Sequence, residues 1–331
     1  MLKSLYSGVS GMKGFQTKMD VIANNIANTN TTAFKSGRAR FQDMISQTNA
    51  NASGPTAAGM GGINPQQVGL GVKVSAIDTI MTGGSLQSTG RDLDFGIERE
   101  GFFAVSSDVD GTGGADGSEE IIVGNKYYTR DGAFFRDYEG NLVNSNGERI
   151  LGYVPIENYS LDPNNLNTYN TVDDPNLSLP GFDDDGNVIG APDADTELAK
   201  LKPLIIPEVI AGDLKLQSYS VDGSGKIIGV YSDGKAYLLG QVGLVKFSNP
   251  EGLEKVGNNN YAFSNNSGEP VAGQAGGNGF GTIRQNFLEM SNVDLANEFT
   301  EMIIASRAYS ANSRSITTSD EMLQELINLK R

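Results

Sequence analysis

Apolar residues near the N-terminus recur at alternating steps of three and four, which is the spacing of one stripe along an α-helix. The stripe consists of Leu5, Gly8, Met12, Phe15, Met19, Ile22 and Ile26. Asn and Thr dominate positions 24–32, and their side chains compete for backbone hydrogen bonds, so the helix is expected to end there. This pattern predicts an N-terminal helix with a seam close to that of a coiled coil.

The C-terminal residues keep the same rhythm over a longer stretch. Its positions are Leu295, Phe299, Met302, Ser306, Tyr309, Ser313, Ile316, Asp320, Leu323 and Ile327. Ser291 and Asp294 resemble a helix-capping box, since Ser can cap free amides and Asp is favourable at the positive helix end. A helix of about 35 residues spans roughly 50 Å. We therefore expect a second, unusually long helix at this end.

Two interpretations of these terminal stripes stay open. Most amphipathic stripes pack onto the protein's own core. Here, however, both lie at the chain ends, both exceed a typical helix, and small or polar residues interrupt the seam. Two helices alone bury too little surface to be stable, so each needs neighbours. The favoured interpretation is that the terminal helices order by packing against other copies of the chain.

Between the two ends the pattern changes to short apolar runs separated by glycine-marked turns, which is typical of β-strands. Runs at 72–77 and 101–105 predict strands, and 127–135 predicts a hairpin with an Asp-Gly turn. Strand signals resume at Leu214, with another hairpin turn at 221–226, and continue to about Gly281. Residues 49–62 are rich in Ala, Gly and Asn and are expected to form a flexible link.

These patterns predict an α+β, multidomain fold. The terminal α-helices, over 1–30 and 291–331, are expected to form a coiled-coil-like core. Residues 31–67 are expected to be a linker or extension. Two mainly antiparallel β domains are nested between the helices: an inner one from 68–150 and 236–290, and an inserted outer one at 151–235. Because the chain leaves and returns through the same end, associated terminal helices must run antiparallel.

Composition narrows the possible functions. The 331 residues include no His, Cys or Trp, which excludes disulfides, cysteine nucleophiles and histidine bases. The net charge of −15 argues against a nucleic-acid partner. Residues 151–199 carry ten acidic and no basic side chains, whereas residues 1–41 carry six basic and one acidic. The acidic stretch is expected to face solvent and the basic end to meet other chains, although a solvated surface without a specific role explains the acids equally well.

No continuous apolar run follows Lys3, so neither a secretory signal nor a membrane span is expected. The sequence thus predicts a cytoplasmic protein or one exported without a cleavable signal.

Three other chemistries are disfavoured. Asp108, Asp110, Thr112, Gly113, Asp116 and Glu119 follow the spacing of a calcium loop, but their flanks predict strands rather than helices. Asp183 and Asp185 resemble a glycosidase pair, yet acids beside glycine are more often solvated turns. The glycine-rich run 273–279 lacks the Lys-Ser/Thr of a phosphate loop. We expect no enzyme activity, no metal, no cofactor and no small-molecule substrate.

Several motifs resemble a known family. Residues 5–12, 20–28 and 34–35 look like the N-terminal signature of flagellar rod and hook proteins. Residues 291–295, 302–303, 307–309 and 320–323 resemble the C-terminal signature, and 69–72, 89–94 and 249–253 are similar to the family's inner β region. The motif residues singled out are Asn24, Asn25, Asn28, Phe34, Lys35, Asn292 and Asp294.

The resemblance implies a structural subunit of the bacterial flagellum that polymerises into a tube. Its implied partners are further copies of itself, neighbouring axial proteins (the distal rod and the hook–filament junction), the hook cap and the flagellar type III export apparatus, and its implied location is the extracellular hook or the basal body, reached without signal cleavage. By position, the implied polymerisation interface sets Leu5, Met12, Phe15, Met19, Ile22 and Ile26 against Leu295, Phe299, Met302, Tyr309, Ile316 and Leu323.

Within the family, the hook subunit is favoured and the distal rod subunit is the alternative. The stretches 69–74 and 89–94 look more like the hook, and so does an inserted outer domain. The long link at 49–67 resembles the distal rod instead.

Overall fold

The chain folds into two units. The computed structural model describes residues 2–54, 61–107, 109–110, 122–123, 125–154, 201–210, 214–277 and 279–329. One unit, here called the helical unit, comprises 1–30, 35–80 and 293–331. The other, here called the β unit, comprises 31–34 and 81–292. The α+β multidomain fold is therefore confirmed, and each unit is described by itself.

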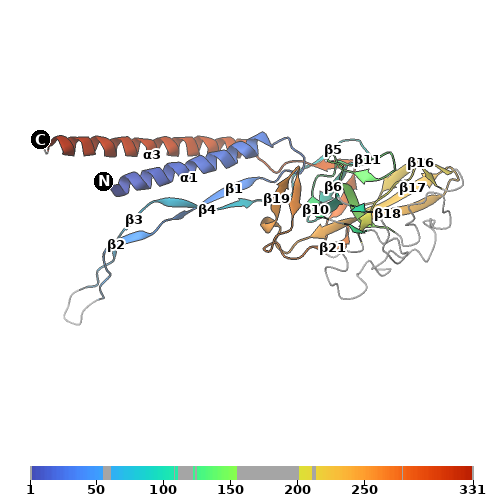
Figure 1. Cartoon of the computed structure of the whole chain (residues 1–331), viewed down its shortest axis with the longest axis horizontal. Coiled ribbons are helices and arrows are strands. Elements are labelled where there is room, and N and C mark those ends of the chain that lie inside the picture. Colours follow the sequence, from blue (N-terminus) through green and yellow to red (C-terminus); the bar gives the residue numbers. More distant parts are fainter. Residues whose placement is uncertain are drawn as a thin grey trace. The chain divides into compact units, whose positions relative to one another are not determined.

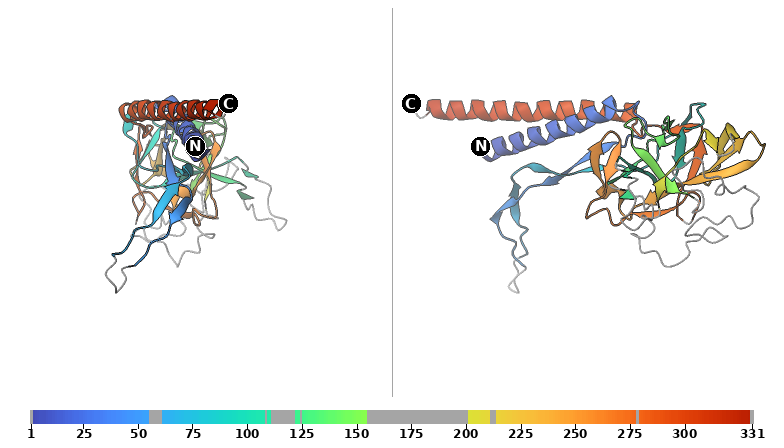
Figure 2. Two further views of the ribbon diagram at one scale, coloured as in Figure 1. Left: turned by 90° about the vertical axis from the view of Figure 1, so that its left-hand side faces the viewer. Right: turned by 45° about the vertical axis from the view of Figure 1, so that its right-hand side comes forward.

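The helical unit contains two long helices and a β-ribbon (Figure 1). The helices are α1 (Leu2–Ala27) and α3 (Leu295–Leu329). The ribbon pairs β1 (Gly37–Asp43) with β4 (Val72–Thr79) antiparallel and continues as β2 (Ser46–Ala50) paired with β3 (Gln66–Gly69). Two further views of the ribbon diagram show α1 and α3 side by side (Figure 2).

The ribbon occupies much of the stretch expected to be a linker. In β1, half-buried Gly37, Ala39 and Phe41 alternate with exposed Arg38 and Arg40. This period of two is that of a strand with one covered face. The sequence predicts a linker or extension over 31–67 and assigns the residues of β4 to the inner β domain. In the structure β4 belongs to the helical unit, because its partner in the ladder is β1.

The β unit is built around one large sheet, which joins thirteen strands among the described residues. Along its main path the strands are β15 (Val209–Ile210), β16 (Leu214–Val221), β17 (Lys226–Tyr231), β18 (Ala236–Lys246), β13 (Arg149–Tyr153), β7 (Phe102–Ser106), β10 (Lys126–Thr129), β20 (Asn260–Ala262) and β19 (Glu254–Gly257). Beside this path lie β11 (Phe135–Arg136), β12 (Leu142–Val143), β14 (Lys202–Pro203) and β21 (Val271–Gln274).

Smaller antiparallel pairs complete the unit: β5 (Leu86–Ser88) with β23 (Phe287–Glu289), β6 (Phe95–Glu98) with β22 (Thr282–Gln285), and β8 (Val109–Asp110) with β9 (Ile122–Val123). A short 3-10 helix, η3 (Pro250–Gly252), precedes β19. All the pairings recorded among the described strands are antiparallel.

Strand β18 makes the large sheet continuous. Its first half pairs with β17, and its second half pairs with β21 and β7. The described strands of the expected outer domain, β16 and β17, therefore share a sheet with those of the expected inner domain, and both belong to the β unit. Most of the acidic stretch, 155–200, lies outside the described residues.

The two hairpin predictions differ in outcome. The turn at 221–226 is confirmed, since β16 and β17 pair across it and Gly225 takes a φ of +78° that favours glycine. The Asp-Gly hairpin at 127–135 is wrong. Strand β10 pairs with β7 and β20, whereas β11 pairs with β12, so Asp131 and Gly132 connect two different ladders.

The core of the β unit has two layers, one on each face of the sheet. One layer includes Phe103, Val105 and Leu244, and the other includes Phe102 and Val245. Every residue of β7 is buried, which explains its continuous apolar run. No helix among the described residues is long and apolar enough to cross a membrane.

Candidate polymerisation surface

The long C-terminal helix begins at a side-chain cap. The Asp294 carboxylate accepts hydrogen bonds from the backbone amides of Ala296 (2.9 Å) and Asn297 (3.4 Å). These amides have no partner within the helix, so the cap stabilises the first turn by about 1 kcal/mol. The sequence interpretation gave the capping role to Ser291, but the helix starts at Leu295 and the adjacent Asp294 takes that role.

Helices α1 and α3 pack antiparallel along most of α1. Ser4 Oγ lies 3.3 Å from Ser319 Oγ, Lys18 Nζ lies 2.5 Å from the Glu301 carboxylate, and Asn25 Nδ2 donates to Glu298 Oε1 at 3.0 Å. As the α1 numbers rise, the α3 numbers fall, which confirms the expected direction.

Small residues set the distance between the two helices. A Cβ atom at Gly8 would lie 2.9 Å from Ile316 Cγ1, and one at Gly11 would lie 2.7 Å from Asn312 Nδ2. On α3 the buried residues are Ala305 and Ser319. The close approach of the two backbones therefore depends on side chains that carry little hydrophobic signal.

The predicted interface residues divide into two groups in the free subunit. On α1, Ile22 is buried, and Leu5, Met12, Phe15, Met19 and Ile26 are half-buried. On α3, Met302, Ile316 and Leu323 are half-buried. Leu295, Phe299 and Tyr309 are exposed, with Phe299 at 50%. The face of α3 that meets α1 is thus offset by about one position from the predicted stripe.

An uncovered apolar surface remains on the helices. On α3 its members are Leu295, Phe299, Ile303, Ile304, Tyr309, Met322, Leu326, Ile327 and Leu329, and on α1 they are Tyr6 and Val9. Ser319 of α3 contacts Ser4 of α1, and α3 continues for ten residues beyond this contact, whereas only Leu2 and Lys3 of α1 precede it. The C-terminal end of α3 therefore extends beyond the start of α1. So many exposed large apolar side chains on one helix make it a candidate interaction surface.

The ribbon covers another side of α1. The rings of Phe15 and Phe41 lie 5.6 Å apart, and a Cβ atom at Gly14 would lie 2.8 Å from the Phe41 ring. Ser10 Oγ accepts a hydrogen bond from the Val72 amide at 3.3 Å. This packing gives α1 neighbours on two sides within its own unit, whereas the large apolar side chains named above on α3 stay exposed.

Asn25 is the motif residue with the most extensive role in this unit. Its buried side chain donates from Nδ2 to the Gly37 carbonyl and accepts from the Gly37 amide, each at 2.9 Å, and also donates to Glu298. It therefore ties α1 to β1 and to α3. Asn28 Nδ2 donates to the Asn24 carbonyl at 2.9 Å near the end of α1, as expected for helix-ending Asn residues.

The remaining motif residues lie near the connections between elements. Lys35 is buried, and the Phe34 ring lies 5.1 Å from Lys255 Nζ. Asn292 Nδ2 donates to the Thr82 carbonyl at 3.3 Å. The sequence motifs singled out these positions but supplied no role for them.

Two acidic side chains of α3, Glu298 and Glu301, contact α1 and differ in their exposure to solvent. Burial raises the pKa of the Glu298 carboxyl, and the Asn25 hydrogen bond opposes this shift only in part. Glu301 instead forms its ion pair with Lys18 at a half-exposed position. Folding thus disfavours the ionised form of Glu298 relative to the unfolded chain.

The other candidate sites have little support. Most of the calcium-like loop, as well as Asp183 and Asp185, lies outside the described residues. The described residues of 273–279 form a strand end and a turn, in which Gly276 donates to the Gly281 carbonyl at 2.8 Å. Within the described ranges, no group of three or more acidic side chains is placed to hold a metal ion.

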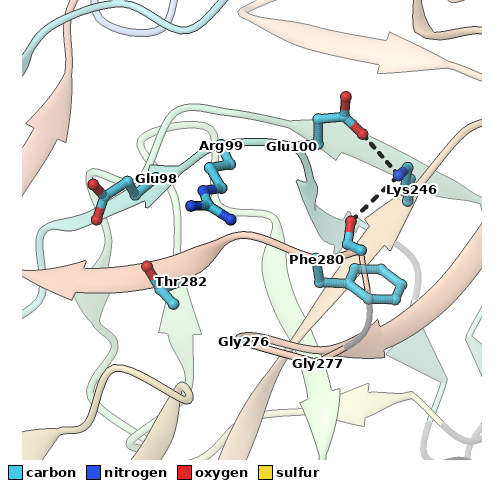
Figure 3. Close-up of a pocket in the computed structure, with 9 residues that line it drawn as sticks. Glu98, Arg99, Glu100, Lys246, Gly276, Gly277, Phe280 and Thr282 are labelled. Carbon is cyan, nitrogen blue, oxygen red and sulfur yellow. Dashed lines mark hydrogen bonds and ion pairs between the residues drawn. The ribbon is translucent and has the colours of Figure 1, made fainter.

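A hollow of about 640 Å³ opens beside that glycine-rich turn (Figure 3). Lys246 Nζ contacts the Glu100 carboxylate at 2.8 Å and donates to the Gly279 carbonyl at 3.3 Å. The hydrogen bond from Lys246 lowers the pKa of Glu100. Glu98 pairs with Arg284 at 2.9 Å. Both acidic side chains at this hollow, Glu98 and Glu100, are thus paired with basic ones.

Comparison with known proteins identifies the family. Residues 5–35 match the family described as "Flagella basal body rod protein", 96–229 match "Flagellar hook protein FlgE/F/G D1 domain", and 284–329 match "Flagellar basal body rod FlgEFG protein C-terminal". The chain is 42% identical over 332 residues to the "Flagellar basal-body rod protein FlgG" of Bacillus subtilis, with all of both chains covered. The chain belongs to the flagellar rod and hook protein family.

Relatives from a single organism include both kinds of subunit. In Borreliella burgdorferi, the "Flagellar hook protein FlgE" is 34% identical over 460 residues and the "Flagellar basal-body rod protein FlgG" is 33% identical over 331, each with full coverage of both chains. A Helicobacter pylori flagellar hook protein FlgE2 structure aligns to 62% of this chain and all of its own, with 11% identity and a TM-score of 0.38.

The family resemblance drawn from the motifs is thus confirmed. The chain is a structural axial subunit of the bacterial flagellum.

Proposed function

We propose that this chain is the hook subunit and has a purely structural role. The observation that carries this proposal is the comparison within one organism, where differences between lineages cancel. In Borreliella burgdorferi the hook protein keeps 34% identity over 460 residues, a span longer than this chain, whereas the rod protein keeps 33% over 331. The alignment with the hook protein is longer than this chain, which indicates that the relative carries additional segments.

The distal rod is the second candidate. The Bacillus subtilis relative that bears the rod name shares 42% of 332 aligned positions, about 139 residues. Strands β2 and β3 of the ribbon also lie at the two ends of the stretch whose length resembles the distal rod in sequence. The hook proteins set against this rod protein come from other organisms, so its identity weighs less than the comparison within Borreliella.

Polymerisation is proposed to bury the uncovered apolar face of α3. In a polymer, Leu295, Phe299 and Tyr309 of one copy pack against a neighbouring copy, while Met302, Ile316 and Leu323 contact both α1 and that neighbour. Half-buried Met12 and Met19 of α1 contribute at the edge of the seam. Burying a large apolar side chain contributes about 1.5–3 kcal/mol, so a few such residues per contact suffice for assembly.

The proposed partners follow from this role. They are further copies of the chain, the adjoining rod and hook–filament junction proteins, the hook cap and the flagellar export apparatus. The proposed location is the extracellular hook, reached without cleavage of a signal.

Deleting the gene in its own bacterium distinguishes the two candidates. If the chain is the hook subunit, isolated basal bodies keep a full-length rod and lack the hook. If it is the distal rod subunit, the rod itself is shortened. Complementation with the intact gene restores the lost part, which controls for effects on neighbouring genes.

Polymerisation itself is tested with two matched substitutions. Phe299→Ser removes an exposed ring from α3, and Phe263→Ser removes a ring of similar exposure, 57%, from the β unit. Neither ring is part of a monomer core, so both variants are expected to fold. Electron microscopy should show tubes for the wild type and Phe263→Ser and none for Phe299→Ser. Tubes of normal length from Phe299→Ser refute the proposed interface.

A further inference from the structure

Three short segments of the β unit lead directly into the helical unit, and they are here called the exit segments. They are Thr31–Phe34, which lies between α1 and β1, residues 81–84, which follow β4, and residues 289–292, which precede α3. They are far apart in sequence. The covalent chain connects the two units only at these segments, so force carried along the chain from one unit to the other passes through them.

Glu289 bonds the third exit segment to the other two. Its side chain is 1% exposed. Oε1 accepts a hydrogen bond from the Gly84 amide at 2.8 Å, and the backbone carbonyl of the same residue accepts one from the Ala33 amide, also at 2.8 Å. One residue therefore contacts the backbones of both other exit segments.

Asn292 makes a second set of ties between the same segments. Its amide donates to the Phe34 carbonyl at 3.3 Å. Its side-chain Nδ2 donates to the Thr82 carbonyl at 3.3 Å and to Thr82 Oγ1 at 3.2 Å. Together Glu289 and Asn292 form a hydrogen-bond network that joins the third exit segment to both of the others.

A buried ion pair holds the Glu289 carboxylate of this network. Arg130 Nη1 lies 3.1 Å and 3.2 Å from the two carboxylate oxygens of Glu289, and Nη2 donates to the Arg99 carbonyl at 2.7 Å. Removing two charges from water is costly, and well-packed apolar residues often stabilise a fold as much. The pair is therefore better explained by the geometry it imposes than by stability alone.

The backbone around this network is also constrained. Ala33 has a φ of +55° and Arg99, whose carbonyl receives Arg130, a φ of +83°; non-glycine residues rarely adopt either value. A Cβ atom at Gly84 would lie 1.9 Å from the Met290 carbonyl oxygen, so only glycine fits there. Strained conformations persist where the surrounding contacts enforce them, and they concentrate at functional positions.

We propose that Glu289 and Asn292 are positioning residues that lock the exit segments into one junction. Force applied to the β unit is then shared among all the exit segments, instead of stretching one segment before the others carry load. This role suits a subunit of a rotating axial structure, and it holds for a hook and for a rod subunit alike.

The test is residue-resolved hydrogen exchange on the full chain below its polymerising concentration. The central variant is Asn292→Ala, which removes the side-chain bonds to Thr82 and leaves both charged side chains of the buried ion pair in place. If the junction is a single cooperative element, the amides of Ala33 and Gly84 exchange at least about tenfold faster, although their own hydrogen bonds are untouched. Amides of the buried strands, such as Val105 and Val245, keep their rates.

A matched control removes a different ion pair from the same unit. Glu98→Gln breaks the exposed contact with Arg284 and is expected to leave Ala33 and Gly84 unchanged. Glu289→Gln should accelerate both amides more than Asn292→Ala does. If that variant unfolds, Asn292→Ala still decides the question, because it does not disturb a buried charge.

A mechanical measurement gives an independent result. Tubes assembled from Asn292→Ala are expected to bend more easily than tubes of Glu98→Gln, seen as a shorter persistence length in electron micrographs. The proposal is overturned if Asn292→Ala leaves exchange at Ala33 and Gly84 unchanged, or if it accelerates the whole β unit equally.

Discussion

Ala305 offers a direct test of how α1 and α3 pack in the free subunit. This residue is fully buried on α3, between the contact of Glu301 with Lys18 and that of Asn312 with Gly11. Replacing it with Leu adds three carbon atoms at a place where the helix backbones approach closely. Overpacking of this kind typically costs about 1–3 kcal/mol, whereas the change in helix propensity is only a few tenths.

The assay is urea unfolding followed by the helical circular dichroism signal, below the polymerising concentration. With a destabilisation of about 2 kcal/mol and a slope of about 2 kcal/mol per molar urea, Ala305→Leu should lower the midpoint by about 1 M. The matched control is Ala311→Leu, the same change at an exposed position of the same helix. Exposed substitutions usually stay within about 0.5 kcal/mol, so its midpoint should shift by less than about 0.3 M.

Equal midpoints for the two variants would refute this packing in the free subunit. They would favour the other interpretation of the terminal stripes, in which the helices become ordered only against neighbouring copies. In that case Ala305→Leu should impair tube formation without changing the unfolding of the free chain.

Three further predictions concern pH, the core and one glycine. Burial raises the pKa of Glu298, so the stability that its protonated form contributes to the helical unit is present at low pH and is lost as pH rises through that pKa. Urea titrations at pH 4 and pH 7 should therefore show a smaller loss of stability between the two pH values for Glu298→Gln than for the wild type. Phe103→Ala, in the buried edge-to-face pair with Phe134, should destabilise the β unit by about 3–5 kcal/mol, whereas exposed Phe263→Ala should cost less than about 1 in the same calorimetric scan. Gly132→Ala places a Cβ 1.7 Å from the Phe95 carbonyl and should prevent folding of the β unit, while Gly147→Ala, with a φ of +82° but open space, should cost only about 1–2 kcal/mol; soluble yield and thermal melting of the two variants check this.

The terminal helices could be predicted from sequence because their signal is local. The step of three and four along each stripe depends only on helix geometry, and α1 (Leu2–Ala27) and α3 (Leu295–Leu329) fall within the predicted ranges. The hairpin at 221–226 was predictable for the same reason, since its turn residues lie between the strands that they join. The family motifs added the flagellar role, which no local physical pattern implies.

The buried face of α3 could not be found in this way. Ala305 and Ser319 are the residues buried on it, and neither has the large apolar side chain by which a stripe is recognised. Which side of a helix is covered depends on the partner helix and on how close it comes. At this contact the closeness follows from Gly8 and Gly11 of α1, almost 300 residues away in the chain.

Strand partners and the exit junction were likewise decided by tertiary structure. The ribbon pairs β1 with β4 across about 30 intervening residues, so a stretch that looks like a linker becomes part of a sheet. Glu289 in sequence is an ordinary acidic residue near a helix start. Its burial follows from Arg130, 159 residues earlier, and from the Gly84 and Ala33 amides, none of which a local pattern connects with it. Periodicity thus determined where the helices form, while long-range pairing decided which faces are buried and which residues hold the units' connections together.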